Sequence, residues 1–238
     1  MSTTDERPTR QKPYFAPPDV GLLVAYQDND LLAVDKPSGL LAVPGRAPLL
    51  QDCLATRVCK RYPQALVVHR LDEATSGLMV FALNAHMQRA LGHAFEQRLV
   101  EKTYIAVVHG MVLDDSGVVD APLGADWPRR PLQRVDTLNG KSAVTRWQVI
   151  SRDTQQQTTR VQLHPQTGRT HQLRVHMQSI GHPICGDLLY AANSSSSSPL
   201  PSPLVAETSK RLMLHAWRLK FAHPLHQQTV QIESALPF

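Results

Sequence analysis

Two apolar segments enclose a short charged one in the run Val67-Val68-His69-Arg70-Leu71-Asp72-Glu73-Ala74-Thr75-Ser76-Gly77-Leu78-Met79-Val80. Residues 65–68 and 78–83 are apolar and of strand length. The segment between them contains Thr75, Ser76 and Gly77, which are typical of a turn. We therefore expect Asp72 to lie on a loop between two core strands, close to Arg70.

Arg70 and Asp72 are opposite charges two positions apart, and such pairs are most often solvated surface pairs of little energetic value. The surrounding residues favour a functional explanation. From His69 onward, the run resembles the catalytic motif of the RluA family of pseudouridine synthases, HRLDxxTSG followed by Leu or Val, at every fixed position. The resemblance implies that Asp72 is the catalytic carboxylate of an RNA-modifying enzyme.

The composition is that of a globular protein. The 238 residues are 42% hydrophobic, which is enough for one large or two small cores. No run reaches the roughly 18 apolar residues of a membrane span, and residues 1–18 have no apolar stretch typical of a signal peptide. Cys53, Cys59 and Cys185 form no CxxC pair and no even set, which argues against a disulfide framework or a structural zinc site. We expect a cytoplasmic protein without a membrane partner.

Positive charge is concentrated in two stretches. Residues 127–147 contain five basic residues and one acid, Asp136, and residues 164–182 contain two arginines, four histidines and no acid. Both stretches could line a groove that binds a polyanion such as RNA. A solvated surface that favours solubility would show the same pattern.

The periodicity of the remaining chain indicates an α+β fold. We expect a flexible tail at residues 1–19 and two strands within residues 22–35 around a turn at 27–30. A short helix is expected at 50–61, and a longer one begins after the N-cap Asn84. Strands at 101–110, 143–151 and 159–163 and a helix at 171–180, ended by Gly181, follow. A Ser/Pro-rich loop covers 193–204.

Three more segments resemble motifs of the same family. Residues 31–40 resemble its strand leading into a DKPxG turn, residues 102–106 its KxYxA motif, and residues 168–176 its GRxHQ(I/L)RxH segment. The family implies a mixed, mostly antiparallel sheet with flanking helices and loops around a basic cleft. Residues 20–238 would form its catalytic domain, and the 20 or so preceding residues are too few for the S4 domain of some members.

Residues 125–135 narrow the resemblance, because they match a DWPxRPxQxV stretch of a compact subgroup. Members of this subgroup modify a uridine in large-subunit (23S) rRNA and one in the anticodon stem-loop of certain tRNAs. We therefore expect RNA stem-loops as substrates and partners, and a monomeric enzyme.

The family resemblance also implies roles for individual residues. Asp72 would act on the ribose, as a nucleophile at C1′ or as a base at C2′, and Arg174 would keep this carboxylate ionised. Tyr104 would stack on the uracil and help remove its C5 proton, and Arg70 would fill the space left by the flipped base. Further substrate contacts are expected from His69, Leu71, Leu173, Arg129, Arg130, Arg134, Arg169 and His171. No cofactor is implied, since the reaction is an isomerisation.

Other classes of function fit part of the pattern. A non-catalytic RNA-binding module or RNA chaperone would keep the basic cleft but would not need Asp72, Tyr104 and Arg174 together. A glycosidase-like hydrolase would need a second carboxylate, and we expect Glu73 to point away. His171 and His176 could ligate a metal, but their spacing is poor for one helix face, and no metal is expected.

Overall fold

A computed structural model describes residues 14–191 and 211–238. The predicted loop at 193–204 and most of the predicted tail therefore lie outside the described residues. The described elements, in chain order, are β1 (Leu23–Gln27), β2 (Leu31–Lys36), η1 (Pro48–Leu50), α1 (Leu54–Arg61), β3 (Leu66–Val67), β4 (Ser76–Ala82), α2 (Ala85–Glu96), β5 (Glu101–His109), β6 (Ser116–Asp120), β7 (Leu123–Ala125), η2 (Trp127–Arg129), β8 (Gln133–Val135), β9 (Val144–Asp153), β10 (Thr158–Pro165), α3 (Gln172–Ser179), β11 (Leu214–Ala222) and β12 (Thr229–Glu233).

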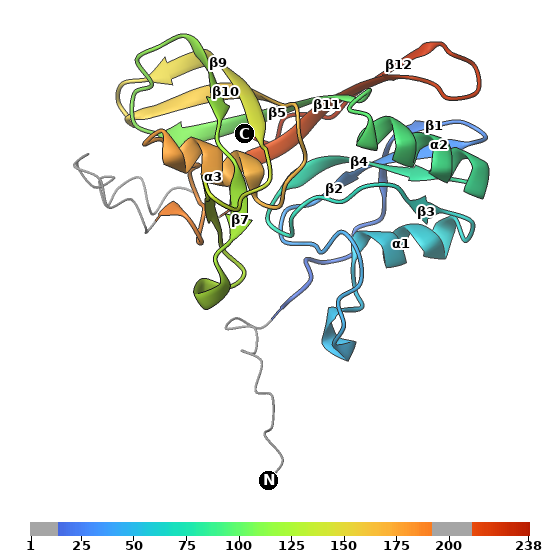
Figure 1. Cartoon of the computed structure of the whole chain (residues 1–238). Coiled ribbons are helices and arrows are strands. Elements are labelled where there is room, and N and C mark those ends of the chain that lie inside the picture. Colours follow the sequence, from blue (N-terminus) through green and yellow to red (C-terminus); the bar gives the residue numbers. More distant parts are fainter. Residues whose placement is uncertain (1–13, 192–210) are drawn as a thin grey trace.

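One ten-stranded sheet runs through the molecule in the order β1-β2-β4-β11-β5-β10-β9-β6, with β3 paired to β4 and β12 to β11. The β4–β11 pair is parallel, and the other pairs of this sheet are antiparallel. β7 and β8 form a separate hairpin. The α+β fold with a mixed, mostly antiparallel sheet is thus confirmed (Figure 1).

The half of the sheet that holds β1 to β4 is covered by a helix on each face (Figure 1). Leu31 of β2 and Leu78 of β4 belong to the core cluster that includes Leu91 of α2. The alternate residues, such as Leu32 and Met79, pack in a second cluster with α1. Because both faces are buried, these strands read as continuous apolar runs rather than as alternating ones.

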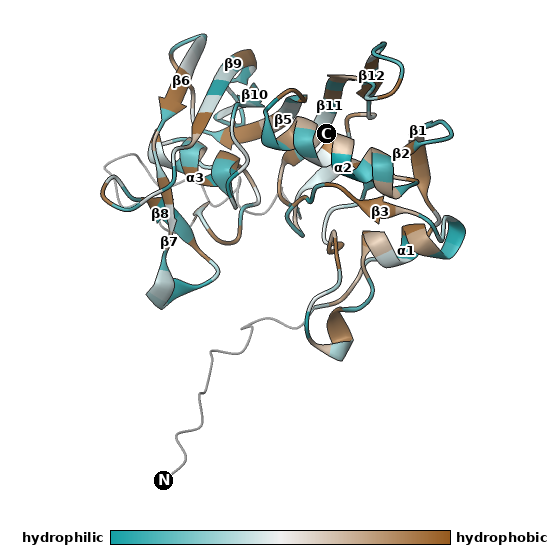
Figure 2. Ribbon diagram, turned by 45° about the vertical axis from the view of Figure 1, so that its right-hand side comes forward, coloured by the Kyte–Doolittle hydropathy of each residue, from teal (hydrophilic) through white to brown (hydrophobic). Residues whose placement is uncertain are grey.

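In the other half, α3 packs on one face of the sheet (Figure 1). Leu173 and Met177 of α3 share a core cluster with Ala106 of β5 and Leu163 of β10. The β7–β8 hairpin extends away from this half, and its tip is mainly hydrophilic (Figure 2). The tip carries η2 and therefore the first part of the predicted basic stretch, which continues through β8 into β9.

The two halves meet where β4 and β11 pair through His215↔Ser76 and Ala216↔Gly77. Gly77 has a φ of +110°, and a Cβ at this position would lie 2.3 Å from the carbonyl oxygen of Ala216. Only glycine fits this close approach of two backbones. Gly77 thus lets the strand that follows the Asp72 loop join the second half of the molecule.

Most predicted elements are confirmed, with shifted ends. The Asn84 side chain caps α2 by accepting from the Met87 amide at 2.8 Å, and Gly181 follows α3 with a φ of +85°. The helix expected at 50–61 begins only at Leu54, because Cys53 pairs with Leu41 and stays extended. Residues 14–18 of the predicted tail contact the folded part. These contacts join Tyr14 to Leu41 and Asp52, and Pro17 and Pro18 to Arg57.

Candidate active site

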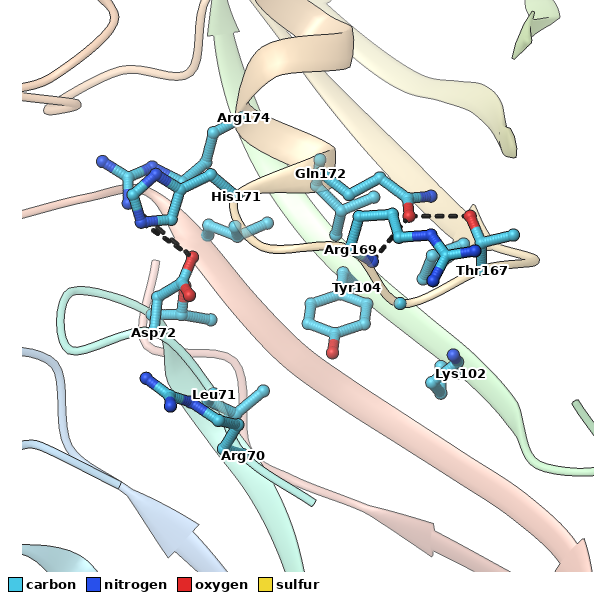
Figure 3. A pocket seen from close by; sticks show the side chains of 15 residues that line it. Arg70, Leu71, Asp72, Lys102, Tyr104, Thr167, Arg169, His171, Gln172 and Arg174 are labelled. Carbon is cyan, nitrogen blue, oxygen red and sulfur yellow. Dashed lines mark hydrogen bonds and ion pairs between the residues drawn. The ribbon is translucent and has the colours of Figure 1, made fainter. Parts of the chain in front are cut away.

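A pocket opens where the two halves of the sheet meet. Its walls come from the loop between β3 and β4, from β5, from the β10–α3 connection and from β11. The lining residues are Arg70, Leu71, Asp72, Thr75, Lys102, Tyr104, Pro165, Thr167, Gly168, Arg169, His171, Gln172, Leu173, Arg174 and Leu214. Figure 3 shows Asp72 facing His171 and Arg174, with Tyr104 between Asp72 and Lys102.

The loop that carries Asp72 is held from behind by the turn after β2. Lys36 is fully buried there and donates to the carbonyls of Pro37, Leu40 and Glu73 at 2.7–3.0 Å. These three acceptors match the three N–H donors of an ammonium group. Burial lowers the pKa of Lys36 to about 7, although the negative charge of Asp72 raises it. The DKPxG turn therefore positions the Asp72 loop.

His69 stabilises the start of the same loop. Its Nε2 accepts from the Val80 amide at 2.9 Å, beyond the last paired residue of β3, and its ring stacks on Phe95 at 4.4 Å. Burial, with Lys102 nearby, lowers the pKa of His69 to about 3. The ring is thus neutral and holds the strand end, and His69 does not line the pocket.

Arg174 is the cation next to the Asp72 carboxylate. Its Nη1 lies 3.7 Å from Asp72 Oδ2, but its stronger partner is Asp187, which accepts from Nε and Nη2 at 2.7 Å each. Arg174 and Asp187 are almost completely buried. A bidentate pair of this kind fixes the plane of the guanidinium, so that Nη1 remains directed at Asp72.

A hydrogen-bonded chain through Tyr190 and His171 ends 4.0 Å from the same oxygen of Asp72. The Gln133 amide donates to the Tyr190 hydroxyl at 2.9 Å, and this hydroxyl is hydrogen-bonded to His171 Nδ1 at 2.7 Å. The other ring nitrogen of His171, Nε2, lies 4.0 Å from Asp72 Oδ2. Burial lowers the pKa of His171, although the Asp72 charge opposes this. Arg174 is therefore the permanent cation, and His171 is a neutral neighbour that links the pocket to β8.

Tyr104 lies on β5 and forms one wall of the pocket. Burial, and secondly the Asp72 charge, raise the pKa of Tyr104. Its phenol therefore stays protonated at neutral pH. The start of α3 closes the pocket on the other side, because Gln172 Oε1 accepts from Thr167 Oγ1 at 2.7 Å and from the Arg169 amide at 3.0 Å.

The structure brings most of the predicted site residues together, namely Arg70, Leu71, Asp72, Tyr104, Arg169, His171, Leu173 and Arg174. The arginines at 129, 130 and 134 lie on the β7–β8 hairpin, away from the pocket lining. Arg129 donates to Asp126 at 2.8 Å, and Arg134 lies 3.7 Å from Asp136. Arg130 lies over the exposed ring of Trp127 at 3.5 Å. The local positive charge is thus smaller than the count over residues 127–147 suggests.

The sequence motifs give no role to Asp187, Tyr190, Lys36 or Lys102. Asp187 and Tyr190 follow Gly186 in a short run after α3, and nothing in their spacing reveals a contact with Arg174 or His171. Glu73 does not line the pocket. His176 is buried and its nitrogens contact Thr145 Oγ1 at 2.9 Å and the Ala121 carbonyl at 3.0 Å, so it does not form a metal site with His171.

The fold and the pocket are those of an enzyme that acts through one carboxylate, which lies next to an arginine in a positively charged pocket. Comparison with known proteins identifies the family. The sequence profile of RNA pseudouridylate synthases matches residues 30–179. The chain belongs to this family of RNA uridine isomerases and, within it, to the RluA family.

The sequences of named relatives match this chain over most of their length. The dual-specificity RNA pseudouridine synthase RluA of Yersinia pestis is 50% identical over 203 residues, which are 85% of this chain and 93% of the relative. That of Escherichia coli K12 is 43% identical over 94% of this chain and 98% of the relative. Among solved structures, human RNA pseudouridylate synthase domain containing 1 has a TM-score of 0.74 and 28% identity, covering 94% of this chain and 87% of that one.

In the described part of the chain, none of the helices combines the length and the apolar character that a membrane crossing requires.

Proposed function

We propose that the chain converts specific uridines to pseudouridine both in large-subunit rRNA and in the anticodon stem-loop of tRNA. Two observations support this choice of substrates. The relatives above are named dual-specificity enzymes, and residues 125–135 match the stretch of the compact subgroup. We further propose that residues 20–238 act as one catalytic domain, as a monomer, in the cytoplasm.

The reaction breaks the N1–C1′ bond of uridine, turns the uracil and forms a bond from C5 to C1′. The C5 proton leaves and N1 gains a proton, so no redox step and no cofactor are needed. Asp72 either attacks C1′ or removes the C2′ proton, and both roles require an ionised carboxylate. The contact of Arg174 Nη1 with Asp72 Oδ2 at 3.7 Å is the observation that carries this assignment.

Tyr104 and Arg70 take the remaining roles at the base. The protonated phenol of Tyr104 suits stacking on the uracil, and it can take part in C5 proton loss only after giving up its own proton. Arg70 is exposed at the pocket rim, where it can occupy the gap that a flipped nucleotide leaves in the RNA.

A non-catalytic RNA-binding module is the alternative. The buried Arg174–Asp187 pair favours the enzyme, because burying two charges costs several kcal/mol before their attraction is counted. RNA binding needs cations on the surface, and it does not need a buried pair that directs an arginine at a carboxylate.

The substitution Asp72→Asn tests the assignment, because it removes the reacting charge and keeps the shape. We expect less than about one per cent of wild-type turnover, a loss of more than about 2.7 kcal/mol in transition-state stabilisation. Tritium release from RNA labelled at uridine C5 measures turnover on an anticodon stem-loop and on a large-subunit rRNA hairpin. RNA affinity should stay within a few fold. Turnover well above one per cent would contradict the role of Asp72.

A further inference from the structure

Lys102 is a positive charge inside the pocket without a negative partner. It lines the pocket from β5 and is half-buried. Among the described residues its ammonium makes no salt bridge and no hydrogen bond. Burial, together with the charge of Arg98, lowers the pKa of Lys102. A half-buried ammonium beside another cation is costly, and an anionic ligand would offset this cost.

The rest of the pocket also has an excess of positive charge. Its lining contains the cations Arg70, Lys102, Arg169 and Arg174 and one carboxylate, Asp72. Asp187 offsets the charge of Arg174 from behind. Arg98, exposed on the turn between α2 and β5, adds a charge next to Lys102 and makes no salt bridge among the described residues. Arg70 lies on the Asp72 side of the pocket, whereas Lys102 lies beyond Tyr104 (Figure 3), and among the described residues neither Lys102 nor Arg98 makes a salt bridge that would offset its charge.

The position of Lys102 relative to Tyr104 indicates which anion it meets. The two residues are two positions apart on β5, so their side chains share a face about 6.6 Å apart along the strand. If the uracil stacks on Tyr104, its sugar–phosphate backbone must pass within reach of a neighbouring residue. We propose that Lys102, with Arg98, binds a backbone phosphate that flanks the flipped uridine. This inference rests on the proposed function, since it takes the position of the base from it.

A neutral uracil oxygen could also accept a hydrogen bond from Lys102. Such a bond would leave the two positive charges of Lys102 and Arg98 unbalanced, whereas a backbone phosphate would offset one of them. Ammonium groups bind phosphate as point charges, without the fixed geometry that a guanidinium demands. The charge balance thus favours the phosphate.

The test is a cycle of protein and RNA changes in the Asp72→Asn background, so that the RNA is not converted. Two anticodon stem-loops are made, with a neutral methylphosphonate at the linkage 5′ or 3′ of the target uridine. The sugar on the 5′ side of that linkage carries a 2′-O-methyl group. Each control RNA has the same 2′-O-methyl group and an ordinary phosphate. Fluorescence anisotropy gives Kd. We expect Lys102→Met to weaken binding of the control RNA about tenfold, as removal of a charge-assisted hydrogen bond does.

Relative to the control RNA, one of the two methylphosphonates should raise the Kd of the Asp72→Asn protein about tenfold. The same methylphosphonate should raise the Kd of the protein that also carries Lys102→Met less than about twofold, because this protein has no ammonium to bind that phosphate. Lys102→Arg should keep most of the affinity and the sensitivity. Lys60→Met, which removes an exposed lysine of α1, is the matched control and should behave like the parent protein. Thermal melts establish that the variants are folded.

Full sensitivity of the Met variant to both methylphosphonates would overturn the assignment of Lys102. A failure of the phosphate assignment is distinguishable from a failure of the proposed function, because wild-type turnover is measured separately. If the wild-type protein forms pseudouridine but the effects of Lys102→Met and of each methylphosphonate on Kd are additive, only the phosphate contact is refuted.

Discussion

Arg174 contacts two carboxylates, and its substitution tests how they share one cation. Arg174→Met leaves the buried Asp187 carboxylate without a cation, with the Leu189 and Tyr190 amides as its remaining donors, so we expect a loss of about 3 kcal/mol or more in the free energy of unfolding. The double variant Arg174→Met with Asp187→Leu removes both buried charges and should regain most of this stability. Its activity should remain at least about tenfold reduced, because Asp72 still lacks its cation. Urea denaturation and turnover on the anticodon stem-loop measure the two effects.

The double variant separates a role in folding from a role in the reaction. Restored activity together with restored stability would mean that Arg174 serves the fold alone. The single variant Asp187→Asn keeps the shape of the pair and should lower the rate less than Arg174→Met does, since Arg174 still faces Asp72 Oδ2 at 3.7 Å.

Among the elements, the β4–β11 junction depends most on a single residue. Gly77→Ala should lower the free energy of unfolding by at least about 2 kcal/mol, because the φ of +110° is strained for alanine and its Cβ would meet the Ala216 backbone. Gly92→Ala on α2 is the control, since a Cβ there meets nothing within 4 Å. It should be neutral or stabilise by up to about 1 kcal/mol. Equal effects in urea denaturation would contradict the close approach at Gly77.

How much of these elements the sequence predicts depends on how local their causes are. The Asn84 cap, the Gly181 helix end and the loop at Asp72 follow from neighbouring residues, and the structure confirms them. The β4–β11 pairing joins Ser76 to His215, 139 positions apart, and no local pattern encodes it. The later start of α1 has the same origin, since the bridge from Cys53 to Leu41 overrides the helical pattern.

The same distinction between local and distant causes applies to the candidate site. The motifs, through the family resemblance, indicate Asp72, Tyr104 and Arg174, and the structure places all three in one pocket. The partners that set their geometry come from distant segments, as Asp187 does for Arg174. His69 illustrates the reverse case, because its place in the motif suggests a substrate contact, whereas its ring holds the Val80 amide. A motif thus identifies which residues matter better than it identifies what each one touches.

At the scale of the whole molecule, the β7–β8 hairpin carries positive charge away from the pocket, and its contribution to RNA affinity is testable through salt. Removing one phosphate contact lowers the slope of log K against log salt concentration by about 0.7 for single-stranded RNA and about 0.9 for a duplex. Arg130 lies over Trp127 and has no carboxylate partner among the described residues, whereas Arg129 is bound to Asp126.

We therefore expect Arg130→Ala to reduce the slope more than Arg129→Ala does, and the double variant to reduce it by the equivalent of one to two phosphates. Turnover at saturating RNA should change little, because neither residue lines the pocket. A binding titration over a range of salt concentrations, with Lys60→Met as the control for net charge, checks this, and slopes equal to that of the control would show that the hairpin serves solubility alone.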